Sequence, residues 1–139
     1  MLKIKILTVG KIKEQWLISA LEEYEKRLLP SMQISWILAK NDEHLELLSQ
    51  KEPFYICLDS LGEELTSSAF HKTLFSLLEK HASSLCFIIG GPLGLHKTLK
   101  RHFVLSLSKL TLTHQMCRLF LIEQLYRAVE TWKGNPYGK

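Results

Sequence analysis

The sequence is poor in aspartate and in paired cysteines, and each shortage removes a class of site. Its 139 residues include two aspartates, Asp42 and Asp59, so a magnesium or phosphoacceptor site built from several aspartates is hard to assemble. The three cysteines, Cys57, Cys86 and Cys117, are far apart and form no CxxC pair. This spacing disfavours a disulfide framework and a metal site, and it predicts buried thiols in a reducing cytoplasm.

Long apolar runs are absent as well. The most apolar stretch, residues 86–89, ends at Gly90-Gly91-Pro92, far short of the roughly 20 residues that a membrane span requires. Lysines alternate with apolar residues in Leu2–Ile6, unlike the continuous apolar core of a signal peptide. No Walker lysine follows the glycines and there is no GxSxG, which disfavours nucleoside triphosphatases and α/β-hydrolases.

What is present indicates one globular domain over residues 1–139. The chain is 46% hydrophobic and 23% charged, which is too apolar for a disordered protein. Its net charge of +4 slightly favours a nucleic-acid partner. The densest basic segment, Lys97–His102, is expected to form a short helix, and it is either a solvated face or a contact with phosphates.

The apolar periodicity predicts five strands that alternate with helices. The strands are expected at residues 2–9, 32–38, 54–58, 85–89 and 103–107. Helices are expected before Pro30, after an Asn41 cap, after a cap at Thr66–Ser68, and from about residue 113 to 132, while residues 59–64 are expected to form a loop. This order predicts an α/β fold with a mainly parallel sheet of five to six strands and flanking helices.

A ligand pocket is expected where three loops leave the carboxyl ends of parallel strands. These loops begin at Leu58-Asp59, at residues 90–94 and at residues 108–112. The glycines of the second loop have two interpretations: a turn that needs positive φ, or a close backbone approach to a flat ligand such as adenosine. His114 lies near this pocket, where packing at the helix entry is a simpler role than catalysis.

The final helix carries apolar side chains at nearly every angle, from Met116 to Val129. Such a helix is expected to be buried all round, so that one face covers the sheet and another meets a second copy of the chain. The pattern therefore predicts a homodimer. Glu123 and Arg127 are four residues apart, so they either pair on the helix or Arg127 acts at the interface or on RNA.

Several segments taken together are similar to one known family. The similarity runs in order along the whole chain, and its most specific part lies between Leu105 and Arg127. The matching segments are Val9-Gly10-Lys11, Ile89-Gly90-Gly91, Leu105-Ser106-Leu107-Ser108-Lys109-Leu110-Thr111, Glu123-Gln124-Leu125-Tyr126-Arg127-Ala128 and Pro136-Tyr137. On these residues the chain resembles the RlmH family, the small SPOUT-class methyltransferases of bacteria.

The resemblance implies properties that periodicity does not predict. They are a C-terminal trefoil knot, a homodimer, the cofactor S-adenosylmethionine, and methylation of N-3 of a pseudouridine in large-subunit (23S) ribosomal RNA of the assembled ribosome. It also implies a set of cofactor contacts, which are Leu58, Gly90, Leu107, Ser108, Lys109, Leu110, Thr111 and Leu112.

The chain departs from the family pattern in two places. Thr113 stands where the family usually has proline, and Gly138 stands where the family usually has a histidine. The expected catalytic residues are therefore Tyr137, which can stack on a base, and Lys139 and Arg127, which can stabilise negative charge. Gly138 also favours an alternative: a catalytically impaired RNA- or ribosome-binding module of the same fold.

Overall fold

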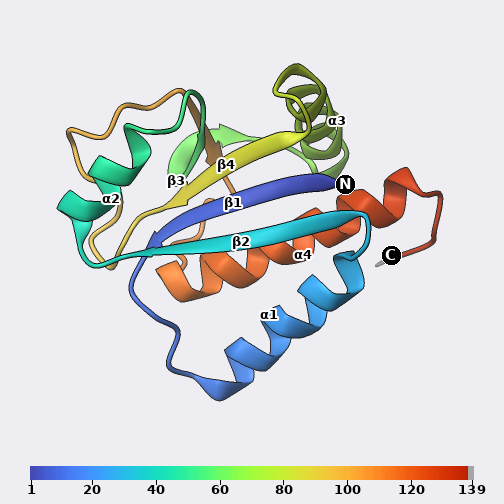
Figure 1. The fold of residues 1–139 in the computed structure, drawn as a ribbon, viewed down its shortest axis with the longest axis horizontal. Helices are drawn as coiled ribbons and strands as arrows, with labels where there is room; N and C mark the ends of the chain where they lie inside the picture. Colours follow the sequence, from blue (N-terminus) through green and yellow to red (C-terminus); the bar gives the residue numbers. More distant parts are fainter. Residues whose placement is uncertain (138–139) are drawn as a thin grey trace.

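Five parallel strands form one sheet in the order β2-β1-β4-β3-β5, with helices on both faces (Figure 1). The computed structural model describes residues 1–137. Its strands are β1 (Leu2–Val9), β2 (Met32–Ala39), β3 (Ile56–Glu64), β4 (Ser84–Ile89) and β5 (Phe103–Ser106). Its helices are α1 (Gln15–Leu28), α2 (Asp42–Ser49), α3 (Ser67–Lys80) and α4 (His114–Trp132). The predicted α/β fold is confirmed. The trefoil knot stays a prediction.

The two-residue period of the strands divides the core between the two faces of the sheet. On one face, Ile4 and Ile6 of β1 join Phe87 of β4 beneath α1, α3 and α4. On the other face, Leu7 and Ile88 pack beneath α2 and the turns that follow β4. Both faces of β4 are therefore covered, which explains why this central strand is apolar from Leu85 to Ile89.

Two expectations about local structure were wrong. Residues 59–64 belong to β3 rather than to a loop, because a bulge between Leu58 and Glu63 lets the strand pair again with Leu105 of β5. The basic segment 97–102 forms turns, not a helix. Leu99 buries its side chain there, and the Arg101 guanidinium donates to the Leu99 carbonyl at 3.0 Å.

Side-chain caps begin three of the four helices, as the sequence predicts for α2 and α3. Asn41 accepts the backbone N–H of His44 at 2.8 Å, and Thr66 accepts that of Ala69 at 3.0 Å. Thr113 caps α4 in the same way, at 3.1 Å from the Met116 nitrogen. Thr113, which the sequence analysis noted in place of a proline, therefore serves as the N-terminal cap of α4.

Helix α4 is buried on one side only within a single chain. Leu121 and Leu125 are fully buried against the sheet, whereas Phe120 is 38% exposed and Cys117 is half-buried. A single chain therefore buries the sheet-facing side of α4 but leaves part of the opposite side exposed, so the expectation of burial all round is met only in part. None of the helices that the structure describes is long and apolar enough to cross a membrane.

We expect the thiols of Cys57 and Cys86 to resist alkylation in the folded protein. Cys57 is completely buried and Cys86 is 3% exposed, and burial raises the pKa of these thiols to about 11 and about 12. Mass spectrometry after iodoacetamide treatment at pH 8 should find label on Cys117 alone. In urea all three cysteines should react, and rapid native labelling of Cys57 or Cys86 would contradict the packing.

Candidate functional site

A cleft of about 780 Å³ lies at the carboxyl ends of the parallel strands, where the sequence predicts a pocket. We call it the strand-end cleft. Its walls come from residues 58–60 at the bulge of β3, the loop after β4, the loop after β5, and the first turns of α1 and α4. Seven of the eight predicted contact residues line it: Leu58, Gly90, Leu107, Ser108, Leu110, Thr111 and Leu112.

Lys109 is the predicted contact that does not line the cleft. Its side chain is 82% exposed, and its Nζ lies 3.5 Å from the Glu64 carboxylate at the end of β3. The neighbouring Ser108 accepts the Leu110 backbone N–H, which shapes this loop from within. Lys109 therefore carries positive charge on the outside of the loop, while its neighbours form the wall.

The glycine loop that follows β4 contains the positive-φ turn that the sequence suggests. Gly94 has a φ of +84°, and its N–H donates to the Gly91 carbonyl at 2.9 Å. A Cβ on Gly90 would lie 2.5 Å from the Gly94 carbonyl carbon and 2.7 Å from the Leu95 nitrogen. The close backbone approach at Gly90 is thus between two parts of the same chain, and it sets the shape of the loop.

Arg118 is a site residue that the sequence analysis did not identify. Its side chain is completely buried, and its Nη2 donates to the carbonyls of Val9 and Gly10 at 2.9 and 2.8 Å. Burial lowers its pKa from the usual value, but an arginine stays charged. Arg118 thereby fixes the end of β1 to α4, directly behind the strand-end cleft. The sequence does carry a signal for this burial. Arg118 lies on the same face of α4 as Leu121 and Leu125, which are buried.

His114 lines the cleft at the first residue of α4. Burial and the neighbouring Arg118 lower the pKa of this imidazole, with Glu14 opposing the shift. The neutral ring is therefore the main form at pH 7, and its Nε2 lies 3.2 Å from the Gln115 amide nitrogen. A neutral imidazole there can exchange a hydrogen bond with a ligand without adding charge to the cleft.

The other predicted catalytic residues lie elsewhere in the same chain. Arg127 is 13 positions beyond His114 on α4, a rise of about 20 Å. Its Nη2 pairs with the Glu123 carboxylate at 2.9 Å, as the helical spacing predicts. Tyr137 packs beside this pair, and Lys139 lies outside the described residues. One chain therefore does not bring Arg127 and Tyr137 to its own cleft.

Tyr137 is held by several groups at once. Its hydroxyl donates to the Glu123 carboxylate at 3.1 Å and lies 3.4 Å from the Tyr24 hydroxyl. Its ring meets Tyr126 edge-to-face at 4.7 Å, and the Arg127 guanidinium lies 5.1 Å from its centroid. Burial, the Tyr24 hydroxyl and the Glu123 charge all raise the pKa of Tyr137. The phenol therefore stays protonated and is no general base at neutral pH.

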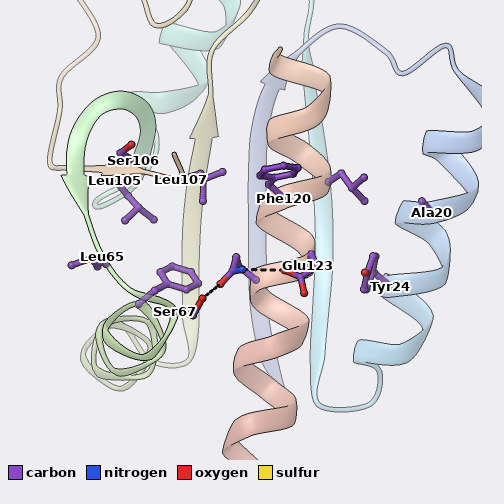
Figure 2. A pocket seen from close by; sticks show the side chains of 12 residues that line it. Ala20, Tyr24, Leu65, Ser67, Leu105, Ser106, Leu107, Phe120 and Glu123 are labelled. Atoms are coloured by element: carbon purple, nitrogen blue, oxygen red, sulfur yellow. Dashed lines mark hydrogen bonds between the residues drawn. The ribbon is translucent and has the colours of Figure 1, made fainter. Parts of the chain in front are cut away.

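A second hollow of about 500 Å³ lies between α1, α4 and the β5 end (Figure 2). We call it the helix groove. Figure 2 shows Ala20 and Tyr24 of α1 on one side, Phe120 and Glu123 of α4 in the middle, and Leu65 opposite. Most of its lining is apolar, so it suits a hydrophobic side chain from another surface better than a polar ligand.

The arrangement at the strand-end cleft suits a small organic ligand with a flat part. Backbone and apolar walls surround it, with Asp59 and Glu14 as its acidic lining residues. Across residues 1–137, no three histidine, cysteine or acidic side chains come together in a way that could hold a metal ion.

Comparison with known proteins gives consistent matches over the whole chain. A family model described as "Predicted SPOUT methyltransferase" matches residues 2–138. A protein of Protochlamydia amoebophila named "Ribosomal RNA large subunit methyltransferase H" is 49% identical over 100% of both chains. A protein of Dictyoglomus thermophilum with the same name is 36% identical, over 98% of this chain and 99% of its own.

Proposed function

Because the chain belongs to the SPOUT methyltransferase family, we propose that it methylates large-subunit ribosomal RNA and takes the methyl group from S-adenosylmethionine. The acceptor that we propose is N-3 of a pseudouridine in 23S RNA of the assembled ribosome, in the cytoplasm. The observation that carries this proposal is the strand-end cleft, because seven residues expected to contact the cofactor meet there from separate segments.

The residues present fit the proposed cofactor. Gly90, Gly91 and Gly94 line the cleft without side chains, so a flat ring can approach the backbone of the glycine loop there. Leu58, Leu107 and Leu112 supply apolar walls. The bound cofactor supplies an activated methyl group on a sulfonium sulfur.

The protein's own contribution is alignment and control of charge. Holding the acceptor nitrogen in line with the methyl group can supply much of the acceleration, about 7–11 kcal/mol in well-oriented reactions. The imide N–H must also lose its proton, which passes to water, and a fixed cation can stabilise the resulting anion. We assign this role to Arg127 and Lys139, and we assign stacking or hydrogen-bond donation to Tyr137.

These assignments require a second copy of the chain. Arg127 and Tyr137 lie far from their own cleft, so we propose a homodimer in which they approach the cleft of the partner. The helix groove and the half-exposed Phe120 offer the apolar surface for this contact. Sedimentation should find a dimer at micromolar concentration, and a stable monomer there would contradict the proposal.

Gly138 favours a second candidate function. With no imidazole at this position, the chain could bind ribosomes through the same fold without transferring a methyl group. Incubation of the protein with methyl-labelled cofactor and ribosomes separates the two functions. Label in one pseudouridine of 23S RNA is expected; ribosome binding with no label in any particle would favour the binding module.

A further inference from the structure

Three segments in and beside the walls of the strand-end cleft are more basic than the chain as a whole. Residues 10–14, 90–102 and 107–113 contain six lysines and arginines and one acid, Glu14, whereas the whole chain contains 18 and 14. The six cations are Lys11, Lys13, Lys97, Lys100, Arg101 and Lys109. A third of the chain's lysines and arginines therefore lies in these segments, while the β3 wall of the cleft adds Asp59, and Glu64 pairs with Lys109.

Trp16 stands at the edge of the same opening. It lies in the first turn of α1, lines the strand-end cleft, and is 58% exposed. The next residue, Leu17, is buried in the core and fixes the helix position, so the indole is presented from a rigid element. Leu93 and Leu110, which also line the cleft, are 94% and 75% exposed.

An exposed aromatic ring beside flexible lysines is the combination that binds single-stranded nucleic acid. Aromatic side chains stack on unpaired bases, and surrounding cations follow the phosphates. Lys11 and Lys13 lie three to five residues before Trp16 and are exposed, which suits phosphates on either side of a stacked base. A buried protein interface would instead be depleted in lysine.

We propose that Trp16 and the lysines of residues 11–13 form the surface that receives an unpaired RNA loop at the mouth of the strand-end cleft. Trp16 stacks on a base next to the nucleotide being modified, and Lys11 and Lys13 contact the phosphates. This inference rests on the proposed function, since it assigns the face on which that substrate enters.

The first test compares two exposed tryptophans. Trp16→Ala should raise KM for ribosomes roughly tenfold to a hundredfold while cofactor affinity and dimer mass stay unchanged. Trp16→Phe should keep most of the activity because it keeps an aromatic face. Trp132→Ala is the matched control: Trp132 is 63% exposed, packs on Phe75 at the far end of α4, and should behave like the unmodified protein.

The outcomes of this test separate the inference from the proposed function. If the unmodified protein methylates ribosomes and Trp16→Ala does so with the same KM, the inference is wrong and the function stands. Loss of cofactor affinity or of the dimer in Trp16→Ala would make Trp16 a cofactor wall or a dimer contact, and would also overturn it.

A second test does not depend on catalysis. A protein with Trp36→Phe and Trp132→Phe retains Trp16 as its single indole, and a synthetic RNA hairpin with an unpaired loop should quench its fluorescence. A fully paired RNA duplex should quench it much less. Absence of quenching by the hairpin would contradict stacking, even if methyl transfer were never observed.

The lysines are tested through salt dependence. Replacing both Lys11 and Lys13 with alanine should reduce the slope of log affinity for the hairpin against log salt by about 1.4, since each contact with single-stranded phosphate contributes about 0.7. The control is a protein with Lys72→Ala and Lys80→Ala, two changes on α3 away from the cleft. It loses the same net charge and should keep the slope of the unmodified protein. Equal slopes for both pairs would overturn the assignment.

Discussion

Deleting Tyr137–Lys139 is expected to lower methyl transfer to ribosomes by at least about a hundredfold, with little change in cofactor affinity. The reason is that a positioned acid, base or charge in the tail typically contributes about a hundredfold to ten-thousandfold to the chemical step. The residues expected to contact the cofactor lie in the strand-end cleft and none belongs to the tail, so cofactor affinity should change little. Calorimetry and single-turnover transfer measure the two effects separately.

Mixed dimers show in which subunit the tail acts. A chain that lacks Tyr137–Lys139 but has an intact cleft can be combined with a chain that has the tail but a damaged cleft. If the tail acts on the partner's cleft, the mixture regains activity that neither chain has alone. If the tail acts only within its own chain, mixing restores nothing, and the proposed exchange between subunits is wrong.

Gly138→His is expected to leave transfer equal or higher than in the unmodified protein. Alignment of the reactants contributes more to the rate than a single general base does, so the missing imidazole need not abolish activity. If the unmodified protein transfers no methyl group to any ribosomal particle while Gly138→His does, the imidazole is indispensable and the binding-module function takes over.

Gly90→Val is expected to weaken cofactor binding by tenfold or more, about 1.4 kcal/mol. Any Cβ at this position meets the backbone of Gly94 at 2.5 Å, and backbone atoms of a hydrogen-bonded turn do not move aside cheaply. The loop that forms one wall of the strand-end cleft must therefore shift, so Gly90→Ala should already show most of the effect. Calorimetry on folded protein measures the affinity.

Gly91→Ala is the matched control for this change. A Cβ on Gly91 would lie 3.4 Å from the Asp42 carboxylate and 3.5 Å from the Val9 Cβ, which are ordinary contacts. The Gly91→Ala protein should bind the cofactor with an affinity within about threefold of that of the unmodified protein. If Gly90→Val folds and binds the cofactor unchanged, the strand-end cleft is not the cofactor site.

Local chemistry made much of the fold predictable from the sequence. Asn41 and Thr66 can accept the free N–H groups of a first helical turn, and both cap helices where expected. Continuous apolar runs such as Leu85–Ile89 predict strands covered on both faces, and β4 is such a strand. The position of the cleft followed from one rule, that loops at the carboxyl ends of parallel strands meet at one edge.

Features set by distant contacts were not predictable in the same way. Residues 59–64 contain charges and a glycine typical of a loop, yet they continue β3 because β5 offers a partner beyond the bulge. The basic segment 97–102 lacks a helix because Leu99 is drawn into the core on the α2 side. The role of Arg118 was not predictable, because its acceptors, the carbonyls of Val9 and Gly10, are more than 100 residues away in sequence.

The place of β4 in the sheet has a consequence for how the chain is made. Lys3 of β1 pairs with Ser84 of β4, which lies 81 positions later, and β4 alone joins the β2-β1 pair to the β3-β5 pair. At about 5–20 residues per second, β1 would wait about 4–16 s for this partner during synthesis. The edge of β1 that pairs with β4 stays open throughout that interval, although α1 and α2, which cover the faces of β1, are made earlier. Substitutions that delay β4 pairing should therefore lower the yield of native protein through aggregation of the nascent chain, even when the finished molecule is as stable as before.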